Sequence, residues 1–126
     1  MTGDLIPNAV RELIAERLDS VPELEAVLLF RENPGRTWTA EEAGTRLYVS
    51  TTVAAYVLDT LAGRGFFTAT GEAYRYQPES ADLAMAVDQL ADAYRRHLVA
   101  ITELIHAKPS RQVRDFANAF RLRKPT

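Results

Sequence analysis

Signals that begin and end short elements follow one another closely between residues 33 and 79. Asn33-Pro34-Gly35 ends a helix, because proline lacks a backbone donor and glycine favours a turn. Thr39-Ala-Glu-Glu42 has the form of a capping box, in which the threonine and glutamate side chains satisfy free amides at a helix start. This part of the chain is therefore predicted to hold several small elements in quick succession.

The capping box predicts a helix that begins after Thr39 and runs to about Leu47, and the β-prone residues 36–39 predict a short strand before it. Tyr48-Val49 has the length of a turn. Ser50 is a suitable N-cap, since its hydroxyl can accept a bond from a free amide of the next helix. The apolar residues of that helix recur at helical spacing, and we expect them on its buried face: Val53, Val57, Leu58 and Leu61.

A β-hairpin is predicted after this helix. Residues 66–70 and 73–77 have the composition of strands, and Gly71-Glu72 between them has the length of a tight turn. Tyr74 and Tyr76 occupy alternate positions of the second strand, so we expect both rings on one face, where they fill part of the core.

Two further helices are predicted before residue 33. The first covers residues 7–18, with a proline tolerated in its first turn. The second begins at Ser20 or Val21, directly ahead of another proline. The expected core residues are Val10, Leu13, Ile14 and Leu18 in the first helix and Leu24, Val27, Leu28 and Phe30 in the second.

The longest periodic stretch covers residues 80–107, with Ser80 as N-cap and Lys108-Pro109 as the stop. Its apolar residues alternate at the spacing of a coiled-coil seam. A helix of about 28 residues is about 42 Å long, which is more than a small domain covers, so we expect it to pack on a second copy. The predicted homodimer interface consists of Leu83, Val87, Leu90, Tyr94, Leu98, Ile101 and Ile105.

Charge is distributed unevenly along the chain, whose net charge is -2. Residues 1–94 contain 7 arginines and 15 acidic residues, whereas residues 95–126 contain 8 basic and 2 acidic residues. The basic end includes a last predicted helix over residues 110–122, with Phe116 and Phe120 on one face. We expect this end to dock on the protein itself; binding to another protein or to flanking DNA phosphates are the alternatives.

Several classes of function find no support in these residues. No apolar run approaches the roughly 20 residues of a membrane span, and there is no cysteine, so we expect a soluble, cytoplasmic protein with no membrane partner. We find no catalytic triad and no phosphate-binding glycine loop, so no enzymatic activity is predicted. Glu103 and His106 have the spacing of two metal ligands on a helix, but a di-metal site needs further ligands, so neither a metal nor a cofactor is predicted.

The order helix, short strand, helix, turn, helix, hairpin over residues 22–77 resembles the winged helix-turn-helix module of bacterial transcription regulators of the MarR, ArsR and PadR types. The likeness is most specific between Leu47 and Phe67, where a serine cap precedes a helix with regularly spaced hydrophobes, and a glycine precedes the first strand. The resemblance implies a mainly α fold of the α+β class, with a winged-helix domain over residues 1–79 and a C-terminal part over residues 80–126. It also implies a homodimeric transcriptional regulator that binds duplex DNA.

Candidate DNA contacts follow from the same resemblance. Hydroxyl groups can bond phosphates or base edges, and alanine or threonine methyl groups can contact thymine. The matching positions are Arg46, Ser50, Thr51, Thr52, Ala55, Tyr56, Arg64 and Arg75. Residues 49–63 contain no lysine or arginine, and the turn Gly71-Glu72 also lacks one. An alternative is therefore a winged-helix protein-interaction module that holds a regulatory partner.

Overall fold

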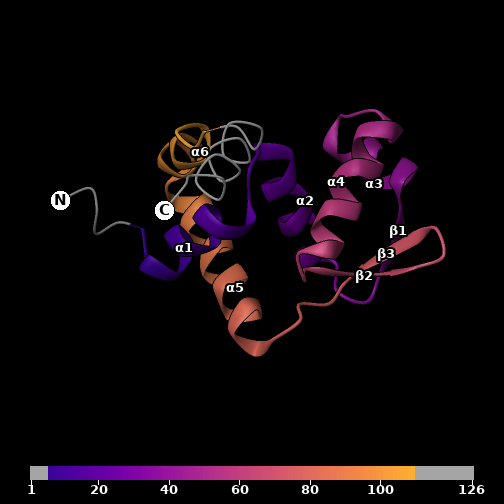
Figure 1. Ribbon diagram of the computed structural model, residues 1–126, viewed down its shortest axis with the longest axis horizontal. Coiled ribbons are helices and arrows are strands. Elements are labelled where there is room, and N and C mark those ends of the chain that lie inside the picture. Colours follow the sequence, from indigo (N-terminus) through magenta and orange to yellow (C-terminus); the bar gives the residue numbers. More distant parts are fainter. Residues whose placement is uncertain (1–5, 110–126) are drawn as a thin grey trace, which may run out of the picture.

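The computed structural model describes residues 6–109, and within this range the chain is mainly helical with a small antiparallel sheet (Figure 1). The helices are α1 (Asn8–Arg17), α2 (Val21–Glu32), α3 (Ala40–Leu47), α4 (Thr51–Gly63), α5 (Ala81–Arg96) and α6 (Leu98–His106). The strands are β1 (Thr37–Thr39), β2 (Phe67–Thr70) and β3 (Ala73–Tyr76). The last predicted helix, residues 110–122, lies outside the described residues.

Helices α1, α5 and α6 gather at one end of the molecule, α3, α4 and the sheet lie at the other, and α2 lies between them (Figure 1). The sheet has the strand order β1-β3-β2, with Trp38 opposite Tyr74 and Phe67 opposite Tyr76. One hydrophobic cluster extends from Ile6 to Ile105. The core is therefore continuous across the predicted boundary between residues 79 and 80.

Side-chain caps begin α2, α3, α4 and α5 where the sequence predicts them. The Thr39 hydroxyl accepts a hydrogen bond from the Glu42 amide (3.2 Å), and the Glu42 carboxylate accepts one from the Thr39 amide (3.0 Å), which completes the capping box. The hydroxyls of Ser20, Ser50 and Ser80 each accept a bond from the amide three residues later. These local bonds explain why the helix starts follow from the sequence alone.

The turn between α3 and α4 brings the two helices into close contact. Tyr48 adopts the left-handed conformation (φ 60°, ψ 40°), which is unusual for a residue other than glycine and reverses the chain direction within a few residues. Gly44 makes the close approach possible, because a Cβ atom there would lie 2.9 Å from the carbonyl oxygen of Val49. The buried residues of α4 are Ala54, Val57, Leu58 and Leu61. The expected burial of Val53 is wrong, since this side chain is 44% exposed at the start of α4.

The single long helix predicted over residues 80–107 is wrong. The chain leaves the helical conformation at His97 (φ −136°, ψ 52°), which separates α5 from α6. Ile101 and Ile105 of α6 are buried in the main core, and α6 packs against α1 as well as α5. A straight helix would carry these two isoleucines away from that core, so burial of their side chains favours the break.

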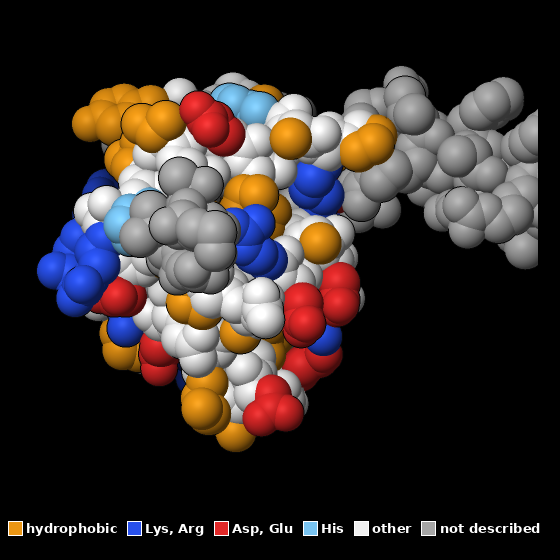
Figure 2. Space-filling model, turned by 90° about the vertical axis from the view of Figure 1, so that its left-hand side faces the viewer, with side chains coloured by type: hydrophobic (Ala, Val, Ile, Leu, Met, Phe, Trp, Pro, Cys, Tyr) orange, Lys and Arg blue, Asp and Glu red, His pale blue; other side chains and the backbone are white. Residues whose placement is uncertain are grey.

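The predicted dimer interface is also corrected. Its residues Leu83, Val87, Leu90, Ile101 and Ile105 are buried within the subunit, Tyr94 is half-buried, and only Leu98, at 53% exposed, remains freely accessible. Figure 2 looks onto the end of the molecule formed by α1, α5 and α6, where the visible hydrophobic side chains are interspersed with charged and polar ones. The apolar spacing reflects packing of α5 and α6 on their own subunit's core.

Candidate nucleic-acid interface

The outward side of α4 is the largest set of predicted contacts that the structure brings together. Ser50, Thr51, Thr52, Tyr56 and Asp59 are exposed, and we call them the α4 face. Tyr56 is 67% exposed. Ala55, also predicted as a contact, is half-buried at the edge of this face. The opposite side of α4 is anchored in the core, so the α4 face is held on a rigid element.

The β2–β3 hairpin lies beside α4 and is joined to it by a hydrogen bond. The hydroxyl of Tyr74 in β3 donates to the carboxylate of Asp59 in α4. This bond and the burial of the ring raise the pKa of Tyr74 to about 12. Tyr74 is buried and Tyr76 half-buried, as predicted for the core-facing positions of this strand.

Alkaline pH should reveal the Tyr74–Asp59 bond. An unfolded tyrosine ionises near pH 10, whereas the pKa of folded Tyr74 is about 12, so the unfolded state releases its proton first and stability falls as pH rises between these values. Burial also raises the pKa of Tyr76 to about 12. We expect Tyr74→Phe to lose less stability than the wild type over this range, measured by urea unfolding at each pH. Tyr48→Phe, a change at a 94% exposed side chain, serves as the control and should follow the wild type.

Two of the three predicted arginine contacts are accessible. Arg46 is exposed on α3, and its guanidinium carbon lies 5.6 Å from the centroid of the Trp38 ring. Arg75 is exposed on β3, where its Nη2 donates to the Gln77 side-chain oxygen (3.1 Å). Sequence reasoning missed Arg36, whose guanidinium carbon lies 3.7 Å from the centroid of the same Trp38 ring. A cation two positions before a tryptophan in a short strand was the available signal.

The prediction of Arg64 as a DNA contact is wrong, because its side chain is turned inward. Its Nη1 donates to the Arg17 carbonyl oxygen (2.6 Å) and the Glu23 carboxylate (2.8 Å), and Nη2 donates to the Asp19 carboxylate (3.0 Å). The Glu23 side chain is 8% exposed and that of Arg64 15%. Arg64 therefore joins the end of α4 to the α1–α2 turn and has no donor fork free for a phosphate.

This ionic cluster also holds the end of α6. Lys108 Nζ donates to the carbonyl oxygens of Ile14 (2.6 Å) and Leu18 (2.7 Å) and to the carboxylate of Asp19 (2.9 Å). Asp19 thus contacts cations from two distant parts of the chain. The cluster fixes the helical end of the molecule relative to α4.

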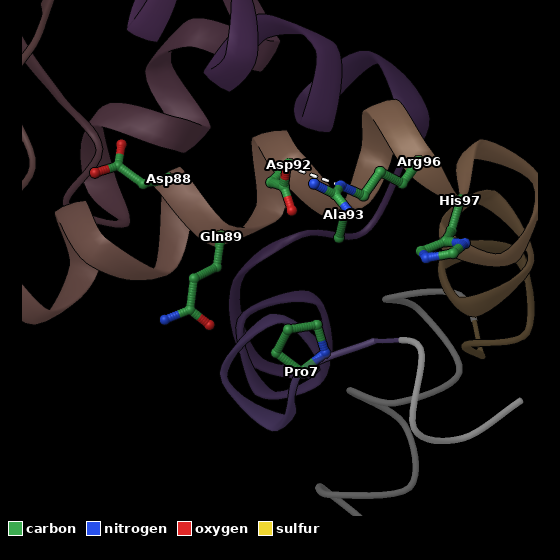
Figure 3. Close-up of a pocket in the computed structure, with 7 residues that line it drawn as sticks. All are labelled: Pro7, Asp88, Gln89, Asp92, Ala93, Arg96 and His97. Carbon is green, nitrogen blue, oxygen red and sulfur yellow. Dashed lines mark hydrogen bonds and ion pairs between the residues drawn. The ribbon is translucent and has the colours of Figure 1, made fainter. Parts of the chain in front are cut away.

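A pocket of about 400 Å³ lies beside the break between α5 and α6 (Figure 3). Its lining residues are Pro7, Asp88, Gln89, Asp92, Ala93, Arg96 and His97. Both carboxylates are already paired, Asp88 with Arg31 and Asp92 with Arg95 and Arg96. Neither carboxylate of this pocket therefore lacks a cationic partner.

None of the helices among residues 6–109 combines the length and the apolar character needed to cross a lipid bilayer. The same residues contain no group of three or more histidine, cysteine or acidic side chains placed to hold a metal ion. Comparison with known proteins adds no assignment: no family model matches the chain, and no match was found among curated proteins or solved structures.

Proposed function

We propose that the protein is a transcriptional regulator that binds duplex DNA through a winged helix-turn-helix. In this proposal α3 and α4 form the helix pair, α4 enters the major groove, and the β2–β3 hairpin is the wing. The observation that carries it is the exposed α4 face, which is anchored from behind by a buried side and lies next to the hairpin. A major groove about 12 Å wide admits one such helix.

The proposed contacts divide by chemistry. Ser50, Thr51 and Thr52 can bond phosphates or base edges, and Tyr56 adds a hydroxyl further along the helix. Arg46 and Arg75 supply attraction to phosphates that does not depend on sequence. Because α4 itself carries no cation between residues 49 and 63, we expect binding to depend on hydroxyl contacts and on cations from the neighbouring elements.

Substitution on the α4 face tests the proposal. Fluorescence anisotropy with labelled genomic fragments should show binding, and Thr52→Ala or Tyr56→Ala should weaken the preferred sequence by roughly tenfold, since each removes a contact to a base edge. Arg75→Ala should weaken binding to all sequences alike and reduce the slope of log affinity against log salt concentration by about one. Gln89→Ala, at an exposed position of α5, is the control. Failure of the wild type to retain any duplex at low salt would refute DNA binding.

A second candidate is binding of a regulatory protein, which a different observation favours. Tyr48 is 94% exposed, and Tyr56 and Val53 also present apolar surface at the start of α4. Tyrosine is frequent among residues that dominate protein interfaces. Under this candidate, Tyr48→Ala abolishes co-purification of a partner and leaves DNA retention unchanged. Truncation after Pro109 tests separately whether residues 110–126 hold the partner.

Homodimerisation is a separate part of the proposal. Most residues of the predicted coiled-coil seam are buried in the core of one chain, which argues against the seam as the interface. Leu98 and Val99 at the start of α6 are 53% and 65% exposed and offer the remaining apolar surface in that region. Sedimentation of the free protein and its stoichiometry on duplex DNA measure whether the protein is a dimer.

A further inference from the structure

Trp38 ends a column of stacked rings. Phe67 stacks on Phe30 with ring centroids 4.2 Å apart, and Phe30 stacks on Trp38 with centroids 5.4 Å apart. The guanidinium of Arg36 lies against the same indole, 3.7 Å from its centroid. Trp38 itself is fully buried, so the ring is a fixed platform for the cation above it.

A second cation from another element reaches this platform. Arg46 comes from α3, and its guanidinium carbon lies 5.6 Å from the Trp38 centroid. Both arginines are exposed, and both lie within the range at which a ring attracts a cation. Two positive groups thus approach one indole ring, and their charges repel.

These two arginines differ from five others in residues 6–109 that form ion pairs with carboxylates. Arg17, Arg31 and Arg64 each bond at least one carboxylate, and so do Arg95 and Arg96. Neither Arg36 nor Arg46 forms an ion pair with a carboxylate in the described part of the chain. The nearby Glu42 carboxylate is engaged by the Thr39 amide in the capping box. The charge of the pair is therefore not neutralised by a carboxylate within the structure.

We propose that Arg36 and Arg46 together bind one phosphate group, and, resting on the proposed DNA-binding function, that this group is a phosphodiester of the duplex backbone. An anion held by both guanidinium groups removes their mutual repulsion and accepts hydrogen bonds from each fork. The aromatic platform holds Arg36 in place before binding, which lowers the entropy lost on association. Arg46 lies in the last turn of α3, four residues before the α4 N-cap Ser50, so the turn between α3 and α4 links this site to the α4 face.

Trp38 is the only tryptophan in the chain, so its fluorescence reports on this site. We expect unlabelled duplex to change the Trp38 emission in a saturable way. Arg36→Gln and Arg46→Gln replace the charged guanidinium with a neutral planar amide, and each should weaken binding about tenfold for every sequence and reduce the salt slope by about one. Arg46→Lys keeps the charge and should retain the wild-type salt slope. Arg95→Gln, which removes an exposed cation from α5, is the matched control and should bind like the wild type.

The outcomes separate this site from the function on which it rests. Wild-type binding of duplex together with unchanged affinity and salt slope in both glutamine variants would overturn the phosphate site and leave DNA binding intact. Absence of any duplex binding by the wild type would overturn both. Inorganic phosphate at matched ionic strength should give no saturable change. A saturable change with phosphate that Arg46→Gln abolishes, together with duplex binding that both glutamine variants leave unchanged, would identify free phosphate as the ligand and overturn the assignment to duplex. Thermal unfolding of each variant checks that the fold is retained, and Arg46→Gln leaves the Arg36–Trp38 stack in place.

Discussion

Replacing Arg64 with alanine is expected to lower the free energy of unfolding by about 3 kcal/mol or more, because it leaves the buried Glu23 carboxylate without its cation. Glu23 is 6% exposed and would lose its bond from Arg64 Nη1. The Arg17 carbonyl oxygen and the Asp19 carboxylate would each lose a donor as well. Urea denaturation followed by circular dichroism, with the slope of the transition compared between variants, measures the loss.

Arg31→Ala is the matched control for this prediction. Arg31 also bonds two carboxylates, those of Glu32 and Asp88, but both acids are more than half exposed. Exposed ion pairs contribute about 1 kcal/mol or less, so this variant should stay close to the wild type. Equal losses of unfolding free energy in the two variants would show that the burial of its ion pairs does not explain the contribution of Arg64 to stability.

Ile101→Ala is expected to cost about 3 kcal/mol, because the truncated side chain leaves a cavity in a packed core. Ile101 is fully buried, and its side chain belongs to the hydrophobic core of a single chain, where α6 packs on that core. The loss should therefore be the same at every protein concentration. In a seam between two copies the loss would depend on concentration, because dissociation would be coupled to unfolding.

Leu98→Ala separates these two cases. Leu98 belongs to the same predicted seam but is 53% exposed in the subunit, so truncation should change the free energy of unfolding by about 0.5 kcal/mol or less. Thermal unfolding at several protein concentrations measures both variants. A concentration-dependent transition that Leu98→Ala abolishes would restore the dimer seam and contradict the assignment of α6 to the subunit core.

The short elements could be predicted from the sequence because their ends are defined locally. The Thr39–Glu42 capping box and the Ser50 cap involve residues only three apart, and the observed bonds are those that the spacing predicts. The exposure of Thr51, Thr52 and Tyr56 follows from the same local pattern, since the opposite positions of the helix are apolar. The candidate α4 face was therefore available from the sequence alone.

The roles of the arginines could not be predicted in this way. Arg64 lies at the end of α4 like a surface cation, but its partners Asp19 and Glu23 are more than 40 residues away along the chain. Arg36 and Arg46 approach the same ring only because α3 packs against β1, the strand that contains Trp38. Whether an arginine is buried, stacked or free for a phosphate depends on which distant residues surround it.

The sequence by itself determined where α2, α3, α4 and α5 begin, the turn between α3 and α4, and the hairpin, because caps, glycines and alternating residues act over a few positions. Only the tertiary structure decided that the chain bends at His97 and that Arg64 turns inward. No proline or glycine marks His97, and the same apolar spacing suits a seam between two copies or a core within one. The burial of Ile101 and Ile105 favours a core within one chain. Their side chains are removed from water by packing of α6 on α1 and α5, and the interruption at His97 allows this packing.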